Sequence, residues 1–367
     1  MTLKPTVAIL LSRQPLRPCG QTGWIRQSQA AVRRLKEDDC TLLSSVGMST
    51  WEMLTTLASL YQIPLKFYLP AVSHEDFLQK KAYYRTQFDL ADPLTEYIPV
   101  IIENRNKTKE EIWAQRDKRL IDEADLLLPV SIKESGHISD LIKACPEKKV
   151  SFDYKIDYEF RDTPLAYEID RGRIKAETAA LAEQYLIHWT RTANTAWPEE
   201  RLLDYYRDIL ESEEYPRSAR ATLLRILTDK KIYASKKNMP ARTATVSFSA
   251  LSPLELLPHM KWRARYRQMA FEPYGLGIKK ETALSRGVVP VGYYDRLDSR
   301  KKEYARDWRY QSTGRITDWR NEKEYRFKGD FCFDGIATDD LIVVCRYGKE
   351  ARMVETATGI KTYSFTD

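Results

Sequence analysis

The chain is short of the residues that build metal centres and covalent cross-links. It has only four histidines in 367 residues, and its five cysteines fall singly, with no CxxC motif and no Cys/His cluster. A multi-histidine metal centre would need nearly all four histidines to converge, and a structural zinc site normally uses paired cysteines. We therefore expect no metal, and we expect the cysteines to be free thiols.

Long apolar runs are also missing. No stretch approaches the roughly 18 to 20 apolar residues of a membrane span. The apolar residues 6–12 are flanked by Pro5 and Arg13 and lack a small-residue cleavage site, which suits a first strand better than a signal peptide. These absences predict a cytoplasmic protein with no membrane partner, and they leave the oligomeric state open.

The composition and the charge distribution indicate a folded protein with a polyanionic partner. Hydrophobic residues make up 43% and charged residues 30% of the chain, which is typical of folded globular proteins. The net charge is +7, and residues 255–330 alone hold 18 Lys/Arg against 11 Asp/Glu. Because the whole excess lies in this stretch, a basic surface for DNA, single- or double-stranded, or for a nucleotide is expected there.

Strand and helix patterns alternate through the first part of the chain, which predicts an α/β fold with a Rossmann-like parallel sheet and helices on both faces. The expected strands are residues 6–12, 41–45, 64–70, 97–102, 125–132 and 149–154. We expect this first domain to span residues 1–158 and a linker to span 159–176. A second domain, residues 177–367, is expected to be α+β, with helices at 177–193, 197–212 and 218–231 and short strands after Ile232.

One stretch of the first domain has the features of a ligand loop. Residues 41–53 predict a buried strand, a turn that contains Gly47, Ser49 and Thr50, and a helix that opens with Trp51 and Glu52. In an open α/β sheet, ligands bind at the carboxyl ends of the strands, where the next helix presents unpaired N–H groups. Glu52 is therefore expected to face a ligand, unless it is only a favourable acid in a first helical turn.

The order Gly-x-Ser-Thr-x-Glu at residues 47–52 resembles the PGGxGTxxE loop of phosphoribohydrolases, within the SLOG and DNA-processing-protein-A group of Rossmann-like domains. The resemblance covers roughly the first 150 residues, although Ser49 stands where that loop has a glycine. It implies that Gly47, Ser49 and Thr50 hold a phosphate and that Glu52 acts at the ribose. An arginine, Arg85 or Arg116, would act with it. If Ser49 leaves no room for the phosphate, the chemistry belongs to the second domain.

A second constellation lies in the second domain. Its motifs are residues 187–190 (IHWT), 274–281 (YGLGIKKE), 290–294 (PVGYY) and 321–327 (NEKEYRF). Their order resembles the AbiGi and DUF2971 abortive-infection families over roughly residues 186–346, and distantly the layout of ADP-ribosyltransferases. That likeness implies a site of His188, Tyr274 and Glu324 with NAD as the cofactor. The plainer alternatives are a core histidine and a solvated ladder of charges along a strand.

Cations and aromatic rings also interleave in the basic stretch. Arginines pair with phosphates and rings stack on exposed bases, so the mixture suits nucleic-acid binding, unless the rings simply pack inward. The residues concerned are Trp262, Arg263, Arg265, Tyr266, Arg267, Arg309 and Trp319.

Three functions follow from these patterns. The first is an antiphage defence enzyme that cleaves N-glycosidic bonds, most sharply a DNA glycosylase that uses Glu52 and needs no cofactor. The second is an NAD-consuming ADP-ribosyltransferase or NADase of abortive infection, centred on His188 and Glu324. The third is a DNA-binding protein of the DNA-processing type that performs no chemistry.

Overall fold

The computed structural model describes residues 4–101, 108–160, 163–237, 239, 242–295, 297–313 and 319–367. The chain divides into two compact units, and each is described by itself. Unit 1 comprises Met1–Asp162 and Thr195–Pro216, and unit 2 comprises Thr163–Asn194 and Arg217–Asp367.

Unit 1 is built on a parallel sheet with the order β4-β3-β2-β1-β5-β6. Its strands are β1 Thr6–Leu11, β2 Thr41–Ser45, β3 Leu65–Ala71, β4 Thr95–Ile101, β5 Leu126–Ser131 and β6 Lys149–Val150. Between them lie α1 Gly23–Glu37, α2 Ser49–Tyr61, α3 His74–Phe88, α4 Lys109–Glu123 and α5 His137–Lys143. The predicted Rossmann-like parallel sheet is confirmed; Ile102, the predicted end of the fourth strand, and residues 161–162 of the predicted linker lie outside the described residues.

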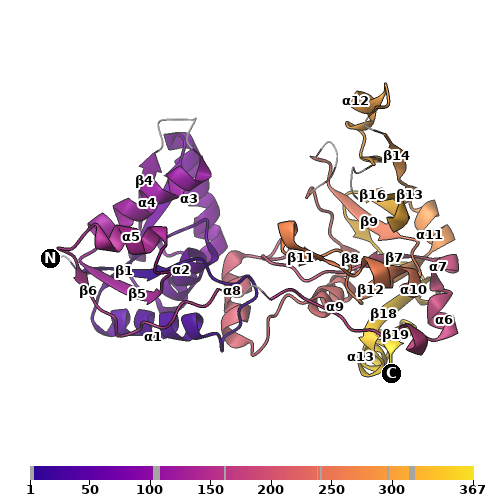
Figure 1. The fold of residues 1–367 in the computed structure, drawn as a ribbon, viewed down its shortest axis with the longest axis horizontal. Helices are drawn as coiled ribbons and strands as arrows, with labels where there is room; N and C mark the ends of the chain where they lie inside the picture. Colours follow the sequence, from indigo (N-terminus) through magenta and orange to yellow (C-terminus); the bar gives the residue numbers. More distant parts are fainter. Residues whose placement is uncertain are drawn as a thin grey trace. The chain divides into compact units, whose positions relative to one another are not determined.

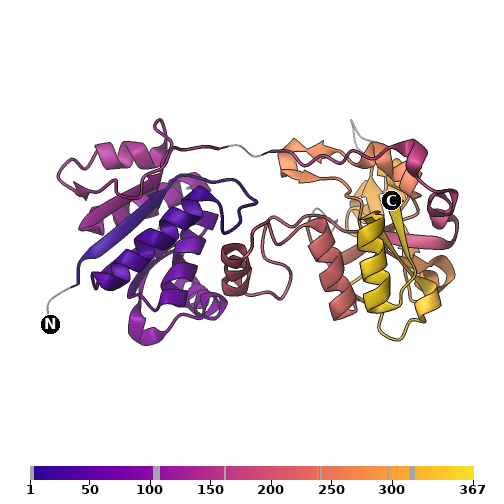
Figure 2. The ribbon, with the colours of Figure 1, turned by 90° about the horizontal axis from the view of Figure 1, so that it is seen from below.

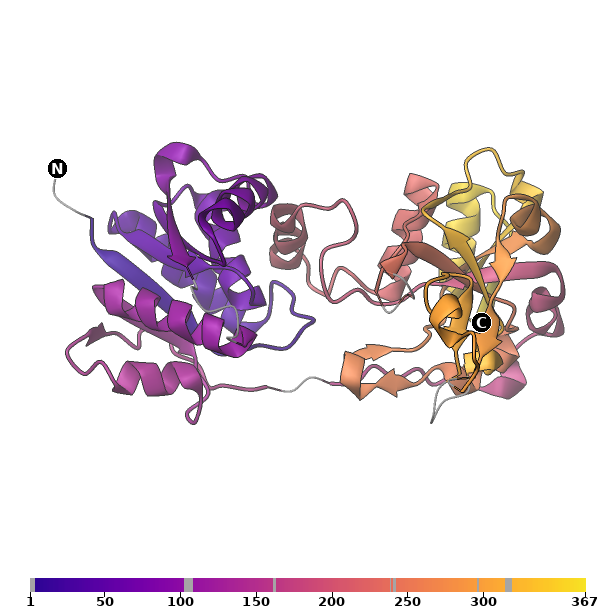
Figure 3. The same cartoon turned by 90° about the horizontal axis from the view of Figure 1, so that it is seen from above.

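The helices of unit 1 cover both faces of this sheet. Crossovers between parallel strands are right-handed, so the steps from β1 to β4 put α1, α2 and α3 on one face, and the return to β5 and β6 puts α4 and α5 on the other. α1 packs on α2 and α4 on α5, and α1 lies below the sheet and α4 above it (Figures 1 and 3). Because the strand order reverses beside β1, the carboxyl ends of β1, β2 and β5 are where such folds bind ligands.

A segment from the middle of the second predicted domain belongs to unit 1. Its helix α8 (Leu202–Glu211) packs on α2 and α3. Leu203, Tyr206 and Ile209 recur at helical spacing, so their stripe is buried, and Tyr206 and Ile209 join the core of unit 1. The predicted domain limits did not include this return of the chain to unit 1, because an amphipathic stripe does not reveal which core it joins.

Unit 2 contains a seven-stranded mixed sheet with the order β13-β16-β9-β7-β12-β18-β19. Neighbouring strands are antiparallel except for β18 and β19, so the predicted α+β second domain is confirmed. The strands are β7 Tyr185–Trp189, β9 Thr245–Ser249, β12 Gly275–Lys279, β13 Val289–Pro290, β16 Glu324–Lys328, β18 Leu341–Tyr347 and β19 Thr362–Thr366.

Smaller elements surround this sheet. Three two-stranded ladders pair β8 Lys231–Ile232 with β17 Phe331–Cys332, β10 Trp262–Arg263 with β11 Gln268–Met269, and β14 Gly292–Tyr294 with β15 Tyr310–Ser312. The helices are α6 Ala176–Ala179, α7 Leu181–Gln184, α9 Ala219–Asp229, α10 Pro253–Leu256, α11 Lys280–Ser285, α12 Lys301–Tyr304 and α13 Gly348–Thr358. α9 and α13 lie side by side (Figure 2), and α12 projects away from the sheet (Figure 1).

The helix predicted at residues 177–193 is wrong. Two short helices, α6 and α7, end at Gln184, and the chain continues as β7 in the middle of the sheet. Five residues of β7 pair with β12, and Gly275 of β12 leaves room for the Ile187 and Trp189 side chains, which a Cβ there would meet at 2.8 and 2.9 Å. Tertiary pairing of a β-branched and aromatic segment therefore overrides its local helical pattern.

Within the described ranges, none of the helices is long and apolar enough to cross a membrane.

Candidate active site

The loop between β2 and α2 has the geometry of a tight turn into a helix. Gly47 has φ +91°, and α2 begins at Ser49, two residues before the predicted start. The N-cap residue of α2, Met48, makes no side-chain capping hydrogen bond. Glu52 lies in that turn, and its Oε1 accepts a hydrogen bond of 3.2 Å from the Gly47 N–H. The carboxylate thus closes the loop back on itself.

Substituting Gly47 tests whether this turn depends on the glycine. An alanine would be forced into the left-handed region, and its Cβ would lie 3.3 Å from Nε1 of Trp113. We expect Gly47→Ala to lower the free energy of unfolding by about 1–2 kcal/mol, measured by denaturant titration. Gly23→Ala, in the first turn of α1, is the control, because its Cβ would also lie 3.3 Å from a neighbour, Ile156, but Gly23 has no positive φ; it is expected to change stability by less than about 0.5 kcal/mol. Equal losses in the two variants would contradict the account of the turn.

Glu52 does not stand open at the end of the sheet. The Tyr206 hydroxyl of α8 donates a 2.7 Å hydrogen bond to its Oε2, so both carboxylate oxygens have partners inside unit 1. Burial raises the pKa of Glu52, while the hydrogen bonds from Tyr206 and Gly47 act in the opposite direction. Burial and the neighbouring carboxylate also hold the pKa of Tyr206 well above its usual value, so Tyr206 remains a donor.

The raised pKa of Glu52 predicts how stability changes with pH. The folded state binds the proton more tightly than the unfolded chain, so Glu52 favours folding most below its unfolded pKa and loses this contribution as pH rises through its folded pKa. Glu52→Gln has no such titration. We expect the stability of the wild type relative to Glu52→Gln to fall as pH rises from about 4, in unfolding curves at a series of pH values. A difference that stays constant with pH would contradict the raised pKa.

The other residues predicted for this site have different surroundings. Arg116 is buried, donates to the Val46 carbonyl and pairs with Asp117 at 2.8 Å, so it holds the loop from inside. Arg85 is exposed and pairs with Asp92 at 2.7 Å. The Thr50 hydroxyl is buried without a hydrogen-bond partner among the described atoms. The loop residues therefore lie together, but the two arginines have structural partners.

Unit 2 contains a cavity of about 460 Å³ at the strands β7, β9 and β16. Five of the residues singled out in the sequence line it although they lie far apart along the chain: His188, Arg263, Tyr266, Trp319 and Glu324. The sheet order explains why His188 of β7 and Glu324 of β16 converge, because β9 alone separates their strands; the other three residues come from β10 and from the segments that follow it and precede β16.

Glu324 is fixed in this cavity by two neighbours. The Ser247 hydroxyl donates to its Oε1 at 2.7 Å. Arg326 donates to both carboxylate oxygens, each at 2.8 Å, through Nε and Nη2. A bidentate arginine and a serine hold the carboxylate in one orientation before any ligand arrives.

His188 is a neutral hydrogen-bonding group in the same cavity. Its Nδ1 lies 2.8 Å from the Ser247 carbonyl oxygen, which can only accept, so Nδ1 carries the proton. Burial lowers the pKa of His188 to about 4. At neutral pH the imidazole is therefore uncharged, and Nε2 is left as an acceptor.

Cations face Glu324 across the cavity. Arg191 lines it; its carbonyl oxygen accepts from the Thr222 hydroxyl, while its guanidinium makes no hydrogen bond or ion pair with the described residues. Desolvation and the neighbouring Arg263 lower its pKa, although the residue as a whole is exposed. Arg263 pairs with Glu322 at 3.0 Å and stacks 4.9 Å from the Trp319 ring. Lys237 donates to Gln268 at 3.2 Å. An unpaired guanidinium in a concave site is suited to bind an anion.

The remaining predicted residues lie outside the cavity lining. Tyr274 donates to Glu350 at 3.2 Å in the core, and Arg309 pairs with Asp307 at 2.6 Å on the surface. Trp262, Arg265 and Arg267 lie on or beside the β10–β11 ladder. Ser247, Arg191, Lys237 and Arg326 were missed. The alternation in TVSFS predicts that Ser247 and Ser249 share a face, but only the strand order shows that Glu324 lies opposite.

Comparison with known proteins gives no identification. No protein-family model matches the chain, and no curated protein matches it. The resemblances drawn from single motifs therefore stay predictions, and the functional argument rests on the geometry of the cavity and of the β2–α2 loop.

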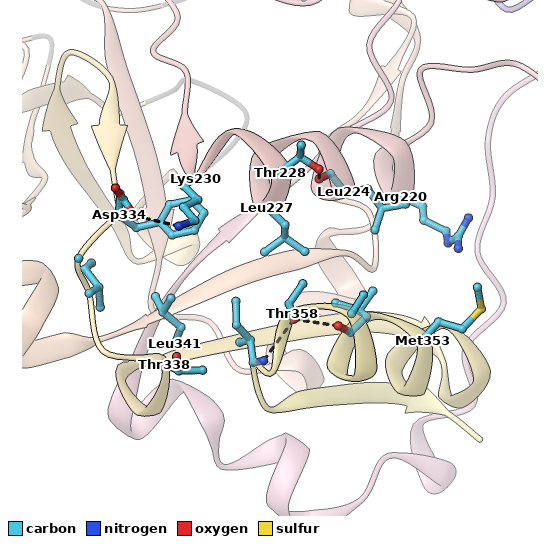
Figure 4. A pocket seen from close by; sticks show the side chains of 16 residues that line it. Arg220, Leu224, Leu227, Thr228, Lys230, Asp334, Thr338, Leu341, Met353 and Thr358 are labelled. Carbon is cyan, nitrogen blue, oxygen red and sulfur yellow. Dashed lines mark hydrogen bonds and ion pairs between the residues drawn. The ribbon is translucent and has the colours of Figure 1, made fainter.

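Unit 2 has a second hollow, of about 730 Å³, between α9 and α13 (Figure 4). It is mostly apolar, with Leu224, Leu227 and Met353 among its walls. Its charged residues form ion pairs, Lys230 with Asp334 at 3.0 Å and Arg220 with Glu350 at 3.3 Å, although Nε of Arg220 makes no hydrogen bond to the described residues. Although it is larger than the cavity around Glu324, it offers no group for catalysis. No three His, Cys, Asp or Glu side chains converge as a metal site in the described part of either unit.

Proposed function

We propose that the cavity of unit 2 binds NAD and breaks the N-glycosidic bond between its nicotinamide and ribose, releasing the ADP-ribosyl group to an acceptor. The observation that carries this proposal is the fixed carboxylate of Glu324, which lines the same polar cavity as the guanidinium of Arg191. The likeness of the HxT and ExE motifs to ADP-ribosyltransferases points to the same residues.

The chemistry suits a carboxylate with this support. As the bond to nicotinamide breaks, positive charge develops on the ribose ring, and a carboxylate held in place stabilises that charge without reorganising. Nicotinamide leaves as a neutral molecule, so the site needs no general acid for the leaving group. His188 is neutral and so is not needed as a proton donor. Its free Nε2 instead accepts a hydrogen bond from a ribose hydroxyl.

The rest of the cavity matches the other parts of a dinucleotide. Arg191, Lys237 and Arg263 supply positive charge for the pyrophosphate, and the rings of Tyr266 and Trp319 supply faces for a flat heterocycle. The volume of about 460 Å³ lies in the usual range for small-molecule sites. Loss of NAD would also stop the growth of an infected cell, in keeping with the abortive-infection resemblance.

Chromatographic detection of nicotinamide from NAD tests the proposal. The wild type is expected to release nicotinamide, and Arg191→Ala is expected to raise KM about tenfold with a smaller change in kcat, since it removes a phosphate contact. Arg309→Ala, whose charge lies outside the cavity, is the control and should behave as the wild type. If the wild type releases no nicotinamide, with or without an added acceptor, the proposal fails.

A second proposal concerns unit 1. The uncapped first turn of α2 and the partnerless Thr50 hydroxyl favour a nucleotide phosphate at the β2–α2 loop, with Glu52 acting as the residue of a base-releasing glycosylase. This proposal requires Tyr206 to leave Glu52. Tyr206→Phe should then increase the release of free base from phage DNA, measured by mass spectrometry, and a variant that releases no more base than the wild type would count against it.

A further inference from the structure

We propose that the acceptor of the ADP-ribosyl group is a single-stranded nucleic acid held by a cationic hairpin at the cavity wall. The hairpin is residues 261–269, which include β10, β11 and the turn between them. The inference rests on the proposed function of unit 2 and adds the class of the second substrate.

The charge of the hairpin has one sign. Residues 261–268 read KWRARYRQ, with four cations and no acid. The strands pair as Trp262 with Met269 and Arg263 with Gln268, and the hairpin extends from the rest of unit 2 (Figure 3). Lys261 and Arg265 are exposed. Such a hairpin attracts a nucleic acid through the phosphates of the nucleic acid.

The same hairpin forms part of the cavity wall. Arg263 and Tyr266 line the cavity together with Ala270 and Phe271, which follow directly in the chain. A nucleic-acid strand bound along Lys261 and Arg265 would therefore run past the opening of the cavity that contains Glu324. The position of the hairpin therefore brings a bound nucleic acid close to the reacting centre.

Aromatic rings on the hairpin favour a nucleic acid over an acidic peptide as the bound polyanion. The Tyr266 ring is exposed by 38% and has the Arg265 guanidinium 5.8 Å from its centroid. Trp319 lies under Arg263 in the cavity. A nucleic-acid base can stack on such ring and guanidinium surfaces, and an acidic peptide has no base to do so.

The size of the cavity selects single strands. The nitrogens of a paired base lie inside the duplex stack, whereas an unpaired base can turn out of the strand and enter a pocket. A cavity of about 460 Å³ that already holds NAD has no room for a duplex, so an unpaired base must meet the ribose at the cavity opening. Single-stranded DNA or RNA, or a flipped nucleotide, is thus the form that reaches the ribose.

The reaction is balanced without a further reactant. The bond between C1′ and the nicotinamide nitrogen breaks, and its electron pair neutralises the pyridinium ring. A ring or exocyclic nitrogen of the base forms the new bond to C1′, and its proton passes to water. The products are nicotinamide, an ADP-ribosylated strand and one proton.

The test incubates the whole protein with NAD and a mixed-sequence 20-nucleotide strand, as DNA, as RNA and as an annealed duplex, and follows both nicotinamide and the mass of the strand. We expect one ADP-ribosyl unit on a single strand and about tenfold less on the duplex. The double variant Lys261→Glu/Arg265→Glu should lower strand modification about tenfold or more, because phosphate contacts become repulsive. The control Lys349→Glu/Arg352→Glu reverses two exposed charges on α13 and should modify the strand as the wild type does.

The outcomes separate this inference from the proposed function. Nicotinamide release with only free ADP-ribose or modified protein as the product would overturn the nucleic-acid acceptor and leave NAD cleavage standing. Equal strand modification by the hairpin variant and the control would overturn the role of the hairpin. Absence of nicotinamide in every arm would overturn the proposed function itself.

Discussion

Glu324→Gln is expected to lower the rate of nicotinamide release from NAD by roughly 10²–10³-fold, the usual effect of removing one fixed electrostatic group from an active site. Glutamine keeps the shape of the side chain, and its carbonyl oxygen still accepts from Ser247. It has no negative charge to stabilise the ribose as the bond to nicotinamide breaks. The loss should therefore fall on kcat, with KM for NAD changed little.

Steady-state kinetics of purified Glu324→Gln check this expectation. The control is Glu303→Gln, an exposed carboxylate on α12, which should have the rate of the wild type. Circular dichroism should show the same secondary structure in all three proteins. If the rate of Glu324→Gln stays within about threefold of the wild-type rate, Glu324 takes no part in the chemistry.

Arg326→Met is expected to destabilise unit 2 by about 3–5 kcal/mol, the usual effect of breaking a buried ion pair by removing one partner. The Arg326 side chain is only 3% exposed and that of Glu324 15%. Arg326 also donates to the carbonyl oxygens of Trp308 and Tyr310, at 2.8 and 3.3 Å. Methionine would leave the two carbonyl groups without the Arg326 donor and the Glu324 carboxylate without its counter-charge, with only Ser247 still donating to it.

Hydrogen exchange of β9 and β16 amides under increasing denaturant measures this loss within unit 2. Arg309→Met, which removes an exposed ion pair with Asp307, should leave exchange unchanged. The double variant Glu324→Gln/Arg326→Met should be more stable than Arg326→Met alone, because it removes the unpaired charge. If Arg326→Met exchanges as the wild type does, the account of a buried clamp is wrong.

The elements of unit 1 follow closely from local sequence. The parallel strands β1, β2 and β5 are short apolar runs followed by turns, and α1 carries a clear apolar stripe, so period and turn chemistry suffice to place them. The turn predicted at Gly47 is present, and the structure adds that Gly47 has a positive φ. Local patterns of this kind need no knowledge of distant partners.

The elements that failed depend on distant partners. β7 has a helical pattern on its N-terminal side and becomes a strand because β12 pairs with it. Tyr206 lies 154 residues beyond Glu52 in the chain, and nothing near either residue indicates that they meet. The clamp of Ser247 and Arg326 on Glu324 likewise exists only because β9 and β16 are neighbours. Strand order and helix docking are long-range facts, so the composition of the candidate site could be predicted only in part.

We propose that NAD cleavage belongs to the cavity of unit 2 and not to the β2–α2 loop of unit 1. Nicotinamide release from NAD by Glu324→Gln and Glu52→Gln, measured side by side with the wild type, tests this directly. We expect Glu324→Gln to lose the activity and Glu52→Gln to retain it. Loss of activity in Glu52→Gln with full activity in Glu324→Gln would contradict it.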